Sequence, residues 1–397
     1  MNAAFVAGQA LASIIWVALS ERCGRRSVLL SCLLLTSGCL VIFGAAPTLL
    51  IAFITRFAQG LASGTSVVGK AYVADLTDGT NEDAAFQLVG LAFGIGSAAG
   101  PLVGGVLAAP PNFVEPCAAV ACFSTLVFAV ALVTLEPSTA YDPLDDNTQP
   151  TAAKVVDEEA PFASGIRGLD ITLEDEPPRT LREVLSDRRS PLVPLLLSFV
   201  LCALSTTAFS EVIPLLAFAR EGLGLDVVHV GLIQSISSVA ALLGSHRITL
   251  APPTAYEAAL LVCALFAYLL PPLVASYAPR WYLLVIPSSI AALAAEVMMG
   301  ALHKMLSKAA PGDVAASALG AGRAVALVGF VTGPVLGGGL FAASSDPRAG
   351  LPPFLRRGRL AFAFCATVAL VNARLASALP PWPAARGRAW RRQRLGG

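Results

Sequence analysis

Long apolar stretches, each about as long as a bilayer is thick, follow one another along the chain. A hydrocarbon core about 30 Å thick needs roughly 20 apolar residues when the chain is helical. The stretches are continuous, as in "LLLSFVLCALSTTAF" from Leu195, and do not alternate as the strands of a membrane β-barrel do. They predict about eleven transmembrane α-helices, over residues 3–19, 28–45, 48–73, 86–108, 113–135, 191–218, 227–246, 255–275, 281–302, 314–342 and 360–379.

The composition is that of a chain that lies in lipid. Of its 397 residues, 56% are hydrophobic and 13% are charged, whereas soluble domains carry about 25% charged residues. The first apolar stretch has no basic segment before it and several arginines after it, so we expect a retained membrane helix rather than a cleaved signal peptide. The fold class that follows is an all-α, multi-pass integral membrane protein.

One long segment interrupts the apolar pattern. Residues 136–190 are acidic and rich in proline, with few large apolar side chains, which predicts a disordered cytoplasmic linker. Five apolar stretches precede this linker and six follow it. We therefore expect an N-terminal helix bundle over residues 1–135 and a C-terminal bundle over residues 191–379, followed by a basic cytoplasmic tail over residues 380–397.

The two halves share a short sequence. "GIGSAAGPLVGG" from Gly94 and "LVGFVTGPVLGGG" from Leu327 both contain G-P-x-x-G-G. Glycines four apart let a second helix approach closely, whereas proline removes a backbone hydrogen bond and kinks the helix. The motif either packs helices statically or limits leakage where two bundles rock against each other, and repeats of this kind build many transporters. Its residues are Gly96, Gly100, Pro101, Gly104, Gly105, Gly333, Pro334, Gly337 and Gly338.

Charged residues gather in the short loop "SERCGRR", which runs from Ser20 to Arg26. Lys and Arg are in excess on this side of the predicted membrane, which places the loop in the cytoplasm. The loop could serve only as a topology signal. Alternatively, its arginines pair with carboxylates when the cytoplasmic side closes and separate when it opens. The residues of this predicted gating loop are Glu21, Arg22, Gly24, Arg25 and Arg26, and Asp75, which lies outside the loop, is their predicted carboxylate partner.

In this order, these residues resemble the signatures of the major facilitator superfamily. The loop resembles G-x-x-x-[D/E]-R-x-G-[R/K]-[R/K], with Val17 in place of the first glycine. "RFAQG" from Arg56 is similar to an R-x-x-x-G motif, and the first glycine–proline sequence is similar to one associated with antiporters. "TTAFSEVIPLLAFAREGLGLDVVHVGLI" is similar to the zinc-induced facilitator-like branch, which is close to bacterial tetracycline exporters. The resemblance implies two pseudo-symmetric bundles of six helices.

The resemblance also implies a helix that this chain does not show. The family has twelve transmembrane helices, but the first stretch here is similar to the family's helix 2. The first copy of the repeated sequence lies in the fourth visible helix of its half, whereas the second copy lies in the fifth. We therefore expect helix 1 to be absent, either because the gene sequence is incomplete or because the protein is truncated. A truncated chain would make transport doubtful.

A few charged residues fall inside the apolar stretches, where each costs about 2.5 to 3.5 kcal/mol on insertion scales. Arg56 holds a motif position, and Lys70 either has a role in transport or extends its amine to the membrane surface. Glu211 ranks first as a proton-coupling carboxylate. Glu296 and Arg323 either pair across helices, or one of them carries a proton. These five residues are the predicted transport and proton-coupling candidates.

The leading hypothesis is a secondary active transporter that moves a small organic solute by alternating access, in exchange for protons. The alternative is a transporter-like receptor or scaffold that does not transport. We expect no enzymatic activity, because no nucleophile elbow or P-loop is present. Neither a cofactor nor a metal site nor nucleic-acid binding is predicted. The expected partners are the solute, protons and lipid, and the expected state is a monomer in the plasma membrane or in an organelle membrane such as the vacuole.

Overall fold

The computed structural model describes residues 1–77, 81–108, 114–135, 191–219, 223–249, 257–309, 315–346, 348 and 350–377, and these residues form helices and no β-strand. Eight of the helices described are long and apolar enough to cross a membrane. The prediction of a helical, multi-pass membrane protein is therefore confirmed. The predicted linker at 136–190 and the predicted tail at 380–397 lie outside the described residues.

The chain divides into two compact units. The first unit covers residues 1–93 and 109–177, and the second covers residues 94–108 and 178–397. Helix α5 therefore begins in the first unit and ends in the second. The helices of the first unit are α1 (Asn2–Cys23), α2 (Arg25–Gly44), α3 (Leu49–Ala62), α4 (Thr65–Leu76), the beginning of α5 (Glu82–Leu107) and α6 (Val114–Thr134).

In the first unit, glycine lets two helices approach closely. Helix α1 packs along α3, and α2 packs on α3, α4 and α6. A methyl group built on Gly60 of α3 would collide with the carbonyl oxygen of Phe5 in α1. A methyl group on Gly8 of α1 would lie 2.9 Å from the backbone nitrogen of Leu61. The two backbones are therefore in contact, as glycine permits between membrane helices.

The apolar stretch predicted at 48–73 forms two helices instead of one. Helix α3 ends at Ala62 and α4 begins at Thr65, with Ser63 and Gly64 between them. Polar groups of α1 reach this break, because the indole of Trp16 donates a hydrogen bond to the Leu61 carbonyl at 2.7 Å. The amide of Gln9 donates to the Ser63 hydroxyl at 3.3 Å. A break inside an apolar helix is tolerated where neighbouring helices satisfy the freed backbone groups.

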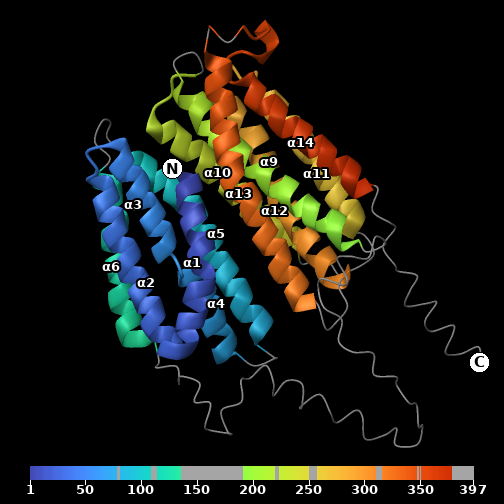
Figure 1. The fold of residues 1–397 in the computed structure, drawn as a ribbon. Helices are drawn as coiled ribbons and strands as arrows, with labels where there is room; N and C mark the ends of the chain where they lie inside the picture. Colours follow the sequence, from blue (N-terminus) through green and yellow to red (C-terminus); the bar gives the residue numbers. More distant parts are fainter. Residues whose placement is uncertain are drawn as a thin grey trace, which may run out of the picture. The chain divides into compact units, whose positions relative to one another are not determined.

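The described part of the second unit contains the end of α5 and six long helices. These are α9 (Leu192–Phe218), α10 (Val227–Thr249), α11 (Glu257–Ala275), α12 (Trp281–Ala309), α13 (Ala315–Ser345) and α14 (Arg359–Ser377), with a short 3-10 helix, η3 (Pro353–Leu355), before the last one. Helix α13 runs alongside α9, and α12 packs on both α10 and α11 (Figure 1).

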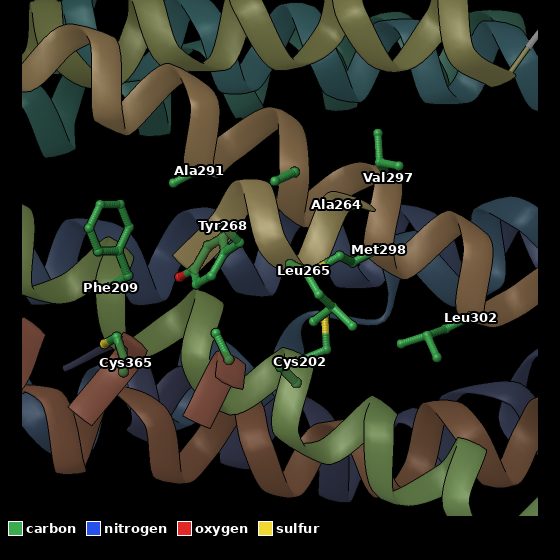
Figure 2. Packing of buried hydrophobic residues seen from close by; sticks show 14 of the residues in the cluster. Cys202, Phe209, Ala264, Leu265, Tyr268, Ala291, Val297, Met298, Leu302 and Cys365 are labelled. Atoms are coloured by element: carbon green, nitrogen blue, oxygen red, sulfur yellow. The ribbon is translucent and has the colours of Figure 1, made fainter. Parts of the chain in front are cut away.

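The core of the second unit gathers around α9. Figure 2 shows Phe209, Tyr268 and the thiols of Cys202 and Cys365 among the aliphatic side chains of α11 and α12. The rings of Phe209 and Tyr268 meet edge to face with their centroids 6.0 Å apart. The Tyr268 hydroxyl donates to the Ser205 carbonyl at 2.9 Å, which gives the buried phenol a partner. This core holds α9, α11 and α12 together.

Candidate functional site

The loop at Gly24 joins α1 to α2 through a backbone conformation that favours glycine. Gly24 has a φ of 85° and is buried, so a side chain at this position would be strained. Helix α2 begins directly after it with Arg25 and Arg26. Cations at a helix N-terminus are unfavourable for the helix dipole, so both side chains need partners on other helices.

Arg25 binds two neighbouring helices. Its Nε donates to a carboxylate oxygen of Asp75, near the end of α4, at 3.0 Å. Its terminal nitrogen donates to the hydroxyl of Ser20 in α1 at 2.6 Å. The Arg25 side chain is 17% exposed and the Asp75 side chain 47%, so the ion pair lies at the edge of the unit. One guanidinium thus joins the ends of α1 and α4.

Arg26 binds a third helix. Its guanidinium donates to the carbonyl of Leu132, in the last turn of α6, at 2.6 Å. Carbonyls of the last helical turn have no partner inside their own helix, and a cation there also compensates the helix dipole. The contacts of Arg25 and Arg26 therefore link α2 to Asp75 of α4 and to the last turn of α6. Glu21 and Arg22, by contrast, are exposed.

Arg56 lies in an aromatic and polar environment inside α3. Its position is about 10 Å along the helix from Leu49, at 1.5 Å per residue. The guanidinium lies over the Phe43 ring, 4.7 Å from the centroid, and 5.8 Å from that of Phe5. It also donates to the Gln59 side-chain oxygen at 2.8 Å. Cation–π contacts of this kind lower the cost of holding a charge in an apolar helix.

The other predicted candidates each lie on a different helix. Lys70 is an exposed residue of α4, and Glu211 is half-buried in α9, two turns before its end. Glu296 in α12 and Arg323 in α13 are both exposed, and within the described part of the chain they form no ion pair with each other. The structure thus supports no cross-helix pair between Glu296 and Arg323.

The repeated glycine–proline sequence lies in α5 and α13, as the spacing predicts. Pro101 and Pro334 are each inside their helix. In α13, the glycine row pairs with α9: a methyl group built on Gly329 would lie 2.6 Å from the Val200 carbonyl oxygen. In the second unit, Gly105 of α5 approaches α10, where its methyl group would lie 3.0 Å from the Val227 carbonyl oxygen.

Two buried polar residues were not predicted, because neither Asn372 nor Ser198 carries a charge that stands out within an apolar stretch. Asn372 of α14 is 1% exposed and its amide donates to the Ser198 carbonyl of α9 at 3.4 Å. The Asn372 oxygen and the Ser198 hydroxyl are both buried with no hydrogen-bond partner in the part of the chain that is described. An asparagine within "LVNARLAS" is the signal that could have found this pair, because buried polar groups normally have partners.

Comparison with known proteins identifies relatives of this chain. It is 42% identical over 92 residues to "Tetracycline resistance protein, class C" of Escherichia coli, which covers 23% of this chain and 23% of that protein. It is 30% identical over 150 residues to "Protein ZINC INDUCED FACILITATOR-LIKE 1" of Arabidopsis thaliana, covering 33% of this chain and 31% of the relative. The matched parts thus span less than a third of either relative's length.

Solved structures show the same fold. The human organic anion transporter MFSD10 (TETRAN) superposes with a TM-score of 0.60 at 19% identity, over 94% of this chain and 82% of that one. A mutant of the nucleoside transporter NupG superposes with a TM-score of 0.68 at 15% identity, over 95% and 90% of the two chains. The family model described as Major Facilitator Superfamily matches residues 1–253, well over half of the chain. This chain is therefore an integral membrane protein of the major facilitator superfamily of transporters.

Proposed function

We propose that this protein moves a small organic solute across the membrane by alternating access, in exchange for protons. The observation that carries the proposal is membership of a transporter family together with ionisable side chains inside apolar helices. Such side chains are costly in lipid and are retained mainly where they serve a pathway. Glu211 and Glu296 are the carboxylates in these positions, and Arg56 is the half-buried cation.

The class of solute is supported by the relatives. One relative is named for tetracycline resistance, and one structural neighbour is named an organic anion transporter. Both names refer to small organic molecules with polar groups. A cavity that binds such a solute needs apolar walls and a few fixed polar groups. Arg56, with its aromatic neighbours Phe43 and Phe5, offers both in the first unit.

The gating role of the Gly24 loop belongs to the same proposal. Arg25 joins the ends of α1 and α4 in the present arrangement. If the arginine contacts differ between two conformations by 1 to 3 kcal/mol, they change the balance of the two states about 5- to 150-fold. We propose that these contacts stabilise one of the two states of the transport cycle.

Proteoliposomes with a proton-sensitive dye inside test the proposal. Tetracycline is added outside under an imposed pH difference, and a panel of organic anions follows. We expect solute-dependent proton movement with the native chain and its loss with Glu211→Gln. Glu115→Gln is the control, since that carboxylate lies in the first turn of α6 and is not a candidate. A native chain that moves neither protons nor any solute of the panel would contradict transport.

A second outcome separates proton coupling from transport itself. If a solute accumulates at the same rate with and without the pH difference, and Glu211→Gln does not change that rate, then the exchange for protons is wrong while transport stands. Arg56→Gln tests the binding role, because it keeps a hydrogen-bonding group and removes the charge that lies over Phe43. We expect a higher solute concentration to be required for half-maximal transport by this variant.

A further inference from the structure

Arginines gather at one end of the second unit, around the turns that precede α12 and α14. Residues 276–282 and 344–360 contain a single carboxylate, that of Asp346, and five arginines: Arg280, Arg348, Arg356, Arg357 and Arg359. Both turns lie on the predicted non-cytoplasmic side, where Lys and Arg are otherwise scarce. Membrane topology therefore does not account for this cluster.

The turn before α14 has a fixed conformation. Arg357 has a φ of 57°, which residues other than glycine rarely adopt, and its backbone N–H donates to the Ser344 carbonyl at 3.0 Å. Gly358 has a φ of 79°, and a methyl group built on it would collide with the Phe341 ring of α13. The turn therefore fixes the position of Arg359, the first residue of α14.

The guanidinium of Arg359 has an unused donor. It lies over the ring of Tyr277, which follows α11, at 4.2 Å from the centroid. Its Nε is buried and has no hydrogen-bond partner within the described part of the chain. A buried donor without a partner is costly, and a cation at a helix N-terminus is unfavourable for the helix dipole. An anion bound at Arg359 would remove both costs.

Tyr277 also lines an apolar groove where α11 ends and α12 begins. The groove has a volume of about 560 Å³, and its lining side chains are apolar except for the Tyr277 hydroxyl. Val274 and Ile286, two of these side chains, are exposed, so the groove is open on one side. Arg280 directly follows Pro279 of the groove and donates to the Tyr282 hydroxyl at 3.1 Å.

Aromatic side chains place the groove at the boundary between lipid and water. Trp281 and Tyr282 begin α12, and Tyr277 follows α11 by two residues. Tyr and Trp are enriched where the head groups of a membrane meet its hydrocarbon. At this depth, one molecule can place a charged group at Arg359 and an apolar chain in the groove.

We propose that this groove binds an anionic phospholipid. Its phosphate accepts hydrogen bonds from Arg359, with Arg280 as a second cation, and one acyl chain lies in the groove beside Ile286. Hydrogen bonds between arginine and phosphate are charge-assisted and stronger than neutral ones. Basic pockets between membrane helices bind anionic head groups by the same chemistry. A water-soluble anion fits less well, because it leaves the apolar walls of the groove uncovered.

Phosphatidylglycerol with a photoreactive diazirine in one acyl chain tests this proposal. The full chain is reconstituted in phosphatidylcholine nanodiscs that contain a small fraction of this probe, and mass spectrometry locates the labels after illumination. We expect labels within residues 273–286, at a level about five times that obtained with the same diazirine on phosphatidylcholine. Unlabelled phosphatidylglycerol should displace the probe, whereas glycerol 3-phosphate, which has no acyl chain, should not.

Two pairs of variants sharpen the test. Arg359→Gln should reduce labelling about fivefold, since one basic residue near an anionic surface contributes about 1 kcal/mol. Arg374→Gln is its control, because Arg374 is exposed in the last turn of the same helix. Ile286→Trp fills the groove and should also reduce labelling. Its control is Ile290→Trp, at an exposed position one turn along α12 that does not line the groove.

Three results would overturn the proposal. Equal labelling by the phosphatidylcholine probe would show that the groove does not select an anionic head group. Labelling that persists in full with Arg359→Gln, in a variant that unfolds at the native midpoint, would show that the phosphate binds elsewhere. Displacement by glycerol 3-phosphate would identify a soluble phosphate as the occupant. None of these measurements depends on solute transport.

Discussion

At the scale of single residues, Arg25 shows how one side chain connects separate helices. Its guanidinium donates through two different nitrogens, to Asp75 and to Ser20. A lysine has one ammonium group and no fixed fork, so it does not reproduce this geometry. Charge and the family resemblance together suggested the Asp75 pair. The Ser20 contact and the Leu132 carbonyl bound by Arg26 depend on packing that no local pattern reveals.

We predict a small but measurable coupling between Arg25 and Asp75. A double-mutant cycle with Arg25→Ala and Asp75→Ala, followed by denaturant unfolding in detergent, should give a coupling of about 0.2–1 kcal/mol, because the carboxylate is half exposed. Arg22→Ala is the control, since Arg22 is exposed in the same loop. Its effect should add to that of Asp75→Ala, and strict additivity for Arg25 as well would contradict the pair.

We also predict that the phenol of Tyr268 stabilises the second unit. Tyr268→Phe removes the hydroxyl that donates to the Ser205 carbonyl, so this carbonyl loses one hydrogen bond. The free energy of unfolding should fall by about 0.5–1.5 kcal/mol. Tyr277→Phe is the control because Tyr277 is 61% exposed and keeps the ring that lies beneath Arg359. Equal losses for the two variants would argue against a specific role for the buried hydroxyl.

At the scale of helices, apolar length predicted the elements well, because a chain in lipid must satisfy its backbone polar groups within each helix. The stretches at 28–45 and 113–135 correspond closely to α2 and α6. The break between α3 and α4 was not predicted. It depends on Trp16 and Gln9 from a different helix, and hydropathy averages over such a two-residue interruption.

The close packing of α1 on α3 gives a prediction at this scale. Gly60→Ala places a methyl group against the Phe5 carbonyl, so the helices must separate. We expect a loss of about 1–3 kcal/mol in the free energy of unfolding, as for other overpacked positions. Gly38→Ala is the matched control, since its methyl group meets open space. It should be neutral or slightly stabilising, because alanine is the better helix former.

The circular dichroism spectrum provides a check on this pair. Both variants should keep the helical signal of the native chain, because neither changes a backbone hydrogen bond. If Gly60→Ala unfolds at the same denaturant concentration as Gly38→Ala, then α1 and α3 are not in backbone contact in the membrane.

At the scale of the whole molecule, family and fold followed from a short list of motifs placed in order along the chain. The loop at Gly24, "RFAQG" and the two glycine–proline sequences were sufficient for this. The solute could not be inferred from the sequence. The polar groups inside the helices are too few to distinguish one small organic molecule from another.

The orientation of the chain gives the prediction at this scale. The excess of Lys and Arg next to α1 and between the two halves predicts that residues 136–190 face the cytoplasm. A protease site inserted there should be cut only when the protease reaches the cytoplasmic side, in inside-out vesicles. A site inserted beside η3 should be cut only from the opposite side. Cleavage of both sites from one side would show that the orientation is wrong.

The bond between Arg26 and the Leu132 carbonyl has a mechanical consequence. Helix α6 ends at Thr134, two residues beyond Leu132, and the chain then continues into the segment that joins the two halves. The guanidinium therefore fixes the last turn of α6 to the first turn of α2. The chain between the two halves thus starts from an anchored helix end, close to the turn at Gly24.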